Sequence, residues 1–260
     1  MNNILDIDVS AEKKRIVSFL KSTFAEQKID KTVIGLSGGI DSTVSFALLK
    51  ETLPPKNIIV AHLYYFHPAF STVEKYVRHC NIPPENIHLI SIKKVVDEVA
   101  RLQGIGTSEK DKVRIGNIAA RMRMIILFDL AKGHQALVCG TENKSENLLS
   151  YFTRFGDQAS DIEPIEHLYK TQVYQLAEFL HVPQEIIDEH PTAGLWHGQT
   201  DEGEFGFTYL EADHVLYLHL DKGFSVEEIE AQGFTNAKKI LAWRQKNLFK
   251  HSTPYTLSTN

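Results

Sequence analysis

Cysteine is scarce in this sequence, and several other signals are absent. Cys80 and Cys139 are the only cysteines, and they lack Cys-x-x-Cys spacing, which argues against disulfide frameworks and zinc sites. No apolar run is long enough to cross a membrane, and the polar N-terminus has no hydrophobic signal region. We therefore expect a cytoplasmic protein without a membrane partner. A net charge of −5 argues against a general nucleic-acid binder, which needs a basic surface.

Short apolar strands alternate with helical patterns along the 260 residues. This alternation predicts an α/β fold with a doubly wound parallel sheet flanked by helices, in a single domain spanning residues 1–260. Strands are expected at 32–36, 57–65, 86–90 and 135–139. Helices are expected at 10–28, 41–52, 70–79, 92–102, 112–132, 169–180, 207–221, 226–232 and 236–245. Ser10 and Thr141 are predicted helix caps, and Gly133 is predicted to end the long helix.

The stretch Gly35-Leu36-Ser37-Gly38-Gly39-Ile40-Asp41-Ser42 is the centre of the pattern. A buried strand breaks at two glycines and restarts as a helix, which builds an anion site from free N–H groups. Asp41 suits a phosphate site only if a cation lies between them, which suggests Mg²⁺. No Gly-Lys-Ser/Thr follows the glycines, so the loop is not a Walker A motif. The alternative is a simple glycine turn with a capped helix.

Two further segments carry candidate site residues. In the long helix, Asn117 and Arg121 share a face whereas Arg123 points elsewhere; the alternative is a solvent-facing arginine pair. After the fourth strand, Glu142 and Glu146 share a helix face, and one of them could complete a Mg²⁺ site; the alternative is a solvated helix surface.

Loops and one strand end complete the candidates. Residues 151–165 suit a binding loop, and residues 190–204 suit a mobile loop that closes over a ligand. His62 and the segment 64–67 are predicted either to line an adenine pocket or to form a packed strand end. The tail from residue 250 to 254 is expected to extend over the surface.

With these residues in view, the chain resembles the ATP pyrophosphatases, which carry Ser-Gly-Gly-x-Asp-Ser, and among them the ammonia-dependent NAD synthetases. The resemblance covers most of the chain in order. It rests on the loop and on these motifs: Gly116-Asn117 with Ala120-Arg121-x-Arg123-Met124, Gly140-Thr141 with Glu146, Thr153-Arg154-Phe155-Gly156-Asp157 with Asp161, Leu168-Tyr169-Lys170-Thr171, Pro191-Thr192-Ala193 and Gln199-x-Asp201-Glu202.

The resemblance implies an adenine nucleotide alpha-hydrolase-like fold and a ligase of NAD biosynthesis. Deamido-NAD would be adenylylated by ATP and then amidated by free ammonia, giving NAD, AMP and pyrophosphate, with no glutaminase domain. It further implies a homodimer with the dinucleotide in an interfacial groove that the helix through Asn117 lines. The C-terminal match usually ends in His-Lys-Arg, whereas this chain has His251-Ser252-Thr253, so the basic contact there is in doubt.

The resemblance also assigns individual residues. ATP would be bound by the loop Gly35–Ser42, Thr141, Lys170 and Thr192. Mg²⁺ would be held by Asp41 and Glu146. Deamido-NAD would be bound by Asn117, Arg121, Arg154, Asp161 and His251. Catalysis would fall to Asp41, Lys170 and Asp157, the last of which would position or deprotonate ammonium.

Two rival functions remain. A tRNA-thiolating ATP pyrophosphatase would need reactive cysteines and a basic RNA surface, which this composition does not favour. A non-catalytic nucleotide sensor would not need the pair Asp41 and Glu146, which suits a transfer-ready metal.

Overall fold

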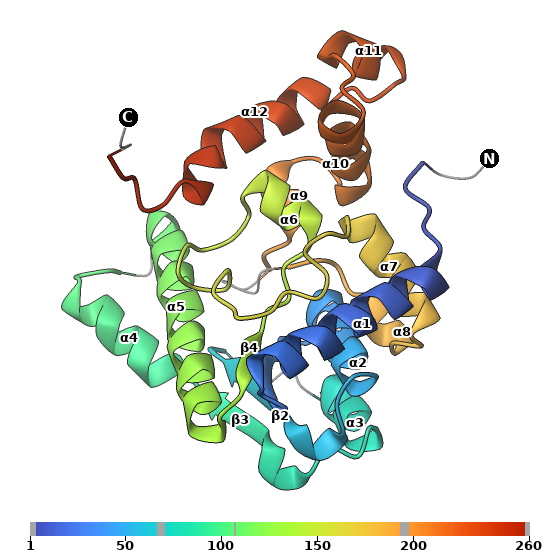
Figure 1. Ribbon diagram of the computed structural model, residues 1–260. Helices are drawn as coiled ribbons and strands as arrows, with labels where there is room; N and C mark the ends of the chain where they lie inside the picture. Colours follow the sequence, from blue (N-terminus) through green and yellow to red (C-terminus); the bar gives the residue numbers. More distant parts are fainter. Residues whose placement is uncertain (1–3, 67–70, 107, 193–197, 258–260) are drawn as a thin grey trace.

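A computed structural model describes residues 4–66, 71–106, 108–192 and 198–257. It confirms the predicted α/β fold with a parallel sheet flanked by helices (Figure 1). Strands β1 (Thr32–Gly35), β2 (Ile58–Tyr64), β3 (Ile87–Ser91) and β4 (Leu137–Cys139) are parallel in the order β3-β2-β1-β4. Since β2 and β4 lie on opposite sides of β1, the strand order reverses between β1 and β4. In the described ranges, no helix is long and apolar enough to span a membrane.

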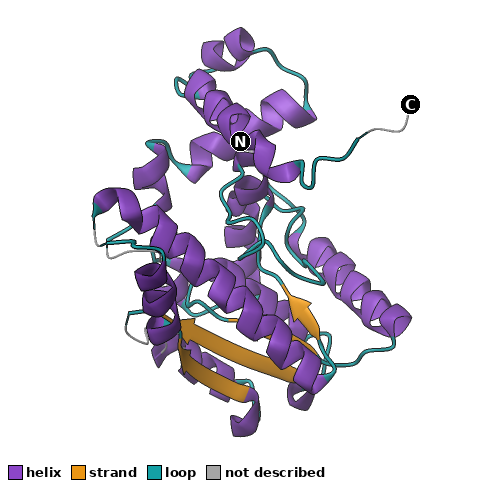
Figure 2. Cartoon of the chain, turned by 90° about the vertical axis from the view of Figure 1, so that its left-hand side faces the viewer, coloured by secondary structure: helices purple, strands orange, loops and turns teal. Residues whose placement is uncertain are grey.

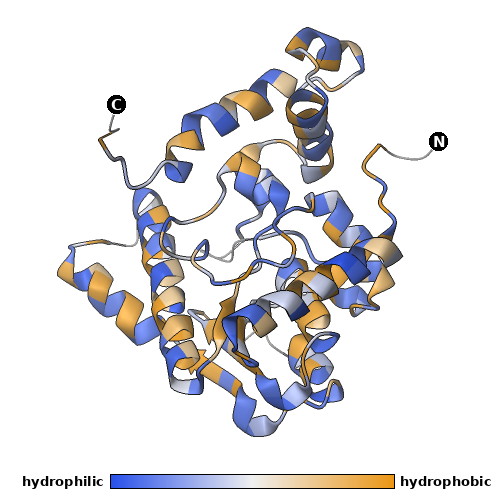
Figure 3. Cartoon of the chain, viewed as in Figure 1, coloured by the Kyte–Doolittle hydropathy of each residue, from blue (hydrophilic) through white to orange (hydrophobic). Residues whose placement is uncertain are grey.

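The sheet is covered by helices on both faces (Figure 2), so its strands are almost wholly apolar. Alternate residues face opposite layers. Ile34, Ile58 and Val60 belong to the larger core with α1, α2, α3 and α7, whereas Val33 and Ile59 pack with residues of α5. The hydropathy colouring in Figure 3 shows the apolar strands in the lower half of the molecule. The sheet is therefore rigidly held, and its carboxyl ends form a stable platform.

The helices agree in position with most of the predicted ranges. Their bounds are α1 Val9–Gln27, α2 Ile40–Lys50, α3 Ser71–His79, α4 Lys93–Leu102, α5 Glu109–His134, α6 Lys144–Leu149, α7 Lys170–Phe179, α8 Gln184–Ile187, α9 Asp201–Phe205, α10 Tyr209–Leu216, α11 Val226–Ala231 and α12 Ala237–Asn247. A π-helical turn, Tyr217–Asp221, continues α10, and short 3₁₀ turns span Pro55–Asn57, Pro84–Asn86 and Leu248–His251.

Three predicted helix ends are wrong, each because a different residue satisfies the backbone. Asp8, rather than Ser10, caps α1 by accepting from Ala11 N at 3.0 Å. Asn143, rather than Thr141, caps α6. Helix α5 runs through Gly133 and ends at Gln135, which adopts the left-handed conformation at φ 55°. Caps depend on which side chain reaches the free N–H groups, and this is not fixed by residue type alone.

A second hydrophobic cluster lies above the sheet domain (Figure 1). It is built from Phe205 of α9, Tyr209 and Leu216 of α10, Ile229 of α11 and Ile240 of α12, packed against Leu149 of α6. We call α9–α12 the helical cap. It was predicted as separate helices without α9, because residues 190–204 were assigned to a loop. The cap covers the carboxyl ends of the strands and forms the second wall of the site.

Candidate active site

The main cavity lies at the carboxyl ends of the strands, beside the point where strand order reverses. Its volume is about 700 Å³. The whole loop Gly35–Ser42 lines it from β1, and Gly140 and Thr141 line it from the end of β4. Ligands of open α/β sheets bind at this position, which agrees with the crevice predicted from the sequence. Trp243 and Asn247 of the helical cap line the opposite wall.

The loop leaves the start of α2 open to a ligand. Gly38 has φ 109°, a conformation that favours glycine, and Gly39 precedes α2 without any side-chain cap. The Ser42 hydroxyl donates to the Gly39 carbonyl at 3.0 Å, and the Ser37 Oγ lies 3.2 Å from the Ser42 Oγ. The uncapped N–H groups of an 11-residue helix therefore face the cavity with its positive dipole end.

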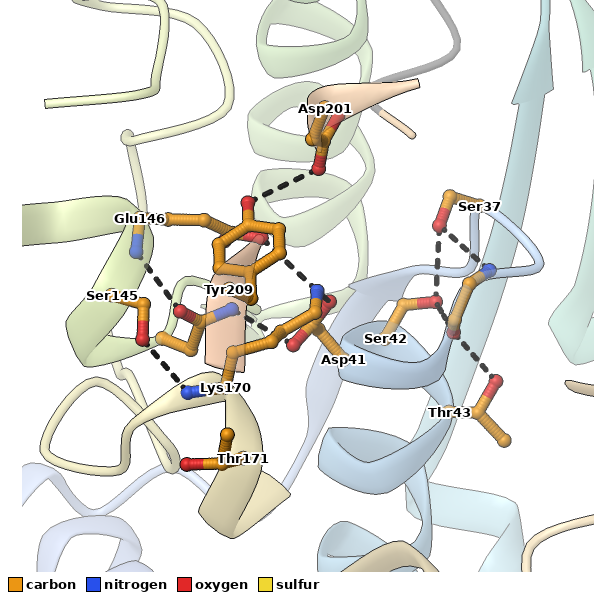
Figure 4. A network of polar contacts seen from close by, with 12 residues as sticks. Ser37, Asp41, Ser42, Thr43, Ser145, Glu146, Lys170, Thr171, Asp201 and Tyr209 are labelled. Atoms are coloured by element: carbon orange, nitrogen blue, oxygen red, sulfur yellow. Dashed lines mark hydrogen bonds and ion pairs between the residues drawn. The ribbon is translucent and has the colours of Figure 1, made fainter. Parts of the chain in front are cut away.

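Lys170, the first residue of α7, lies among the acidic residues of the cavity (Figure 4). Its ammonium donates to Asp41 and lies 3.3 Å from Glu146 Oε1. Asp201 adds its charge and bonds to the Tyr209 hydroxyl at 3.1 Å. Burial opposes the charge of Lys170, but Asp41 and Glu146 outweigh it and raise its pKa. Three carboxylates thus surround one ammonium and leave an excess of negative charge.

A buried network fixes the backbone of Lys170. Its N–H donates to Ser145 Oγ at 2.8 Å, and the Ser145 hydroxyl donates to Asp213. The other Asp213 oxygen accepts from Thr171 N at 2.9 Å. Burial raises the pKa of Asp213 to about 6. Side chains from α6 and α10 therefore hold the start of α7, and this contact was not predictable from residue spacing.

Glu142 and Glu146 occupy different environments. Glu146 lines the cavity in α6, whereas Glu142 precedes the helix and is only 6% exposed. The predicted shared helix face is therefore wrong. Burial, followed by the charge of Asp157, raises the pKa of Glu142 to about 10, and burial also raises that of Glu146. The cavity position favours Glu146 over Glu142 as the candidate ligand.

Asp157 lies where the cavity meets the loop after α6. Its Oδ1 accepts from Thr153 N at 2.9 Å, and its carboxylate is accessible from the cavity. Protein nevertheless surrounds it closely enough for burial to raise its pKa. A carboxylate with a raised pKa is a better general base near neutral pH.

The remaining predicted residues form two groups. Asn117 and Thr192 line the cavity. Arg121, Arg154, Asp161 and His251 are not among the residues that line it. Arg121 Nε donates to Arg154 O at 3.2 Å, so these two lie side by side at the surface. Asp161 Oδ2 accepts from Val138 N at 2.8 Å, and His251 bonds to Ser150 and Asn147.

Arg123 was predicted to point elsewhere than the face shared by Asn117 and Arg121, and it nevertheless lines the cavity. The cavity-facing side of α5 is centred on Ala120 and Met124, so the long Arg123 side chain reaches in from its edge while Arg121 remains exposed. Its Nε donates to Leu63 O at 2.9 Å. The sequence placed both arginines on the same helix, two residues apart. Only the orientation of α5 on the sheet decides which of the two side chains enters the cavity.

The strand end after β2 takes part in the cavity. His62, Tyr64, Tyr65 and Phe66 line it, while His67 is outside the described residues. His62 Nδ1 lies 2.7 Å from Leu36 O, which ties β2 to the loop. The segment therefore both packs and faces the ligand space, and an adenine pocket here stays a prediction.

The loop predicted at 190–204 is partly ordered into structure. Residues 193–197 are outside the described residues, but 201–205 form α9, with Asp201 N donating to Pro191 O at 3.0 Å. Gln199 Nε2 donates to Tyr151 Oη at 3.1 Å and is buried. The predicted mobile loop is therefore wrong for 201–204, because these residues form a helix whose start Thr200 caps.

Comparison with known proteins decides the family. A family model described as NAD synthase matches residues 12–254. The chain belongs to the NAD synthase family. An NH₃-dependent NAD⁺ synthetase of Fusobacterium nucleatum is 39% identical over 234 residues, which are 89% of this chain and 88% of that protein.

Solved structures of the NAD synthase family have the same fold. The structure of NMN synthetase from Francisella tularensis matches with a TM-score of 0.80 and 32% identity, covering 98% of this chain and 100% of that one. NH₃-dependent NAD synthetase from Campylobacter jejuni, in complex with the nitrate ion, matches with a TM-score of 0.78 and 27% identity, covering 97% and 100%.

Proposed function

We propose that this protein is an ammonia-dependent NAD synthetase, a ligase that forms a C–N bond. It converts deamido-NAD, ATP and ammonia to NAD, AMP and pyrophosphate through an adenylylated intermediate. The observation that carries the proposal is the cavity in which the loop Gly35–Ser42, Lys170 and Asp157 meet, in a chain 39% identical to a synthetase of that name. The tRNA-thiolation alternative is not favoured by these relatives.

The first step joins the nicotinate carboxylate to ATP. A carboxylate oxygen bonds to the α-phosphorus while the bond to the bridging oxygen breaks and pyrophosphate leaves. Charge develops on the departing pyrophosphate, so the open start of α2, the hydroxyls of Ser37 and Ser42, and Lys170 are suited to stabilise it. ATP is therefore the co-substrate that these groups bind, together with Thr141 and Thr192 at the cavity wall.

The second step needs a proton acceptor. Ammonium must lose a proton before its nitrogen attacks the acyl carbon, and AMP then leaves with the former carboxylate oxygen. Asp157 is placed for this role because it is held by Thr153 N and opens to the cavity. No protein nucleophile is required.

The donor set of the cavity fits Mg²⁺. Asp41 and Glu146 are hard oxygen donors, and together with Asp201 they exceed the single ammonium of Lys170 in charge. We propose that Asp41 and Glu146 hold the ion. Bound there, it would neutralise charge on the polyphosphate.

Four of the five residues predicted to bind the dinucleotide do not line the cavity. We propose that Asn117, Arg121, Arg154, Asp161 and His251 bind deamido-NAD along the surface next to the cavity, in a groove at a homodimer interface. Sedimentation at micromolar concentration tests this assembly: a monomer would contradict an interfacial site. Because ATP and nicotinate nucleotides are intracellular metabolites, we also propose a cytoplasmic enzyme that acts without nucleic acid or membrane.

The decisive experiment is a product assay. Purified protein is incubated with ATP, Mg²⁺ and deamido-NAD, with either ammonium or glutamine as nitrogen source. We expect NAD, AMP and pyrophosphate with ammonium and little product with glutamine, as the ammonia-dependent reaction requires. Formation of ADP would exclude the reaction class. Because the Francisella neighbour is called NMN synthetase, nicotinate mononucleotide is tested as a second acceptor.

A further inference from the structure

Arg123 is a half-buried cation that lines the cavity, and it has one side-chain hydrogen bond within the described part of the chain. Its Nε donates to Leu63 O, and across the described ranges the four N–H groups of its two terminal nitrogens have no hydrogen-bond partner. Among the described residues, no carboxylate lies within ion-pair distance of its guanidinium. Burial lowers the pKa of Arg123, although the charge of Asp157 opposes this. A half-buried guanidinium that faces the cavity without an anionic partner is a ready donor, so an anion is expected to complete the site.

The position of Arg123 identifies which anion. It bonds to the end of β2 next to His62 and the aromatic residues 64–66, and its charge acts on both His62 and Asp157. Lys170 and the start of α2 already provide the groups for pyrophosphate. Arg123 therefore lies between the strand end predicted to hold adenosine and the candidate ammonia site. The group that joins these two places in the reaction is the phosphate next to adenosine.

We infer that Arg123 binds the α-phosphate of ATP, which becomes the phosphate of the adenylylated intermediate and of AMP. A guanidinium presents paired N–H donors that match two phosphate oxygens. Arg123 is thus a catalytic residue that stabilises charge on AMP as the leaving group. The inference rests on the proposed function only in that ATP is the co-substrate.

Binding measurements test the inference without the complete reaction. Calorimetry compares AMP, adenosine, pyrophosphate and deamido-NAD on the wild-type protein and on Arg123→Gln, Arg123→Lys and Arg114→Gln. Arg114 is the matched control, because it lies exposed on the same helix and pairs with Asp111. We expect Arg123→Gln to weaken AMP binding about 10- to 100-fold. Adenosine and pyrophosphate should change less than about twofold, and Arg123→Lys should fall between.

Several results would overturn the inference. Wild-type protein that binds AMP no better than adenosine would do so without any variant. Unchanged AMP binding in Arg123→Gln would also do so, as would a loss confined to deamido-NAD, which would place the anion on the acceptor. Since AMP binding does not depend on the acceptor, these results are separate from failure of NAD synthesis.

Thermal unfolding distinguishes a role of Arg123 in anion binding from a structural role in holding β2. If Arg123 binds an anion, Arg123→Gln should keep or raise the melting temperature of the free protein. The rise in melting temperature on adding AMP should then be smaller than in the wild-type protein. A large fall for the free protein with equal weakening of all ligands would assign Arg123 to a structural role through Leu63.

Discussion

Asn143 Nδ2 donates to Asp41 Oδ1 at 2.9 Å, although 102 residues separate them in the chain. The same side chain caps α6 by accepting from Glu146 N at 3.0 Å. One fully buried amide thus fixes both candidate Mg²⁺ ligands, one on α2 and the other on α6. Residues that orient ligands contribute to metal affinity without touching the metal.

We predict that Asn143→Ala weakens both the fold and the metal site. Loss of the cap and of the Asp41 hydrogen bond should lower the free energy of unfolding by about 1–3 kcal/mol. The Mg²⁺ concentration for half-maximal activity should rise about 10- to 100-fold. Urea unfolding and Mg²⁺ titration measure these effects. Asn147→Ala on the same helix, whose side chain bonds to Glu166 outside the cavity, is the control and should leave the Mg²⁺ dependence unchanged.

Asp41→Asn should reduce turnover far more than stability. Asp41 is one of three carboxylates around Lys170, so removing its charge relieves repulsion in the free protein while Glu146 still pairs with the ammonium. We expect turnover to fall by at least about 100-fold, with a smaller change in the unfolding free energy because Glu146 still pairs with the ammonium. Steady-state kinetics and urea unfolding test this. Equal losses in both would instead indicate a structural role for Asp41.

The sequence predicted well those structural features that neighbouring residues in the chain determine. A β-branched run followed by Gly38-Gly39 favours a strand that ends at the start of a helix with an open N-terminus, so the loop and its crevice were predicted correctly. Strand alternation with helices likewise fixed the parallel sheet.

The parts that sequence missed depend on contacts between distant segments. Arg123 enters the cavity because of how α5 lies on the sheet, and Asp213 reaches Ser145 across 68 residues. Helix α9 is short, and it forms because Phe205 packs into the cap and Thr200 caps its start. Propensity and spacing cannot encode such tertiary contacts.

The buried carboxyl of Glu142 should make stability depend on pH. Burial raises the pKa of Glu142 to about 10 in the folded protein, whereas the unfolded chain loses this proton near the ordinary glutamate value of 4.5. Between these values the folded state holds one more proton, so this group lowers the unfolding free energy as pH rises, by up to about 1.4 kcal/mol per pH unit. Glu142→Gln mimics the protonated form and should remove that part of the slope.

The comparison of Glu142→Gln with wild type needs an exposed control. Glu98 pairs with Arg101 at the surface, and this hydrogen bond lowers its pKa, so its titration is complete below the range in question. Glu98→Gln should leave the pH slope above 5 unchanged. Urea unfolding at pH 5, 7 and 9 measures the slopes. Identical slopes for Glu142→Gln and wild type would mean that Glu142 is ionised in the folded protein.

The C-terminal tail does not simply extend over the surface. Lys250 Nζ donates to Ser150 O and Phe152 O, each at 2.9 Å, and lies 5.5 Å from the Phe152 ring centroid. Its side chain lines the cavity, and burial lowers its pKa. This chain lacks the basic residues expected after His251, so the ammonium of Lys250 is the cation that the tail brings to the cavity.

We predict that Lys250→Gln raises the KM for the nicotinate acceptor about 10-fold, because a charged donor near the bound anion is lost, while the KM for ATP changes less. Lys239 provides a matched control: its ammonium also bonds to a backbone carbonyl, Gly206 O, and lies over a phenylalanine, Phe207, but it does not line the cavity. Lys239→Gln should lower the melting temperature without changing either KM. If both variants raise the KM equally, Lys250 acts through stability of the tail and not through the ligand.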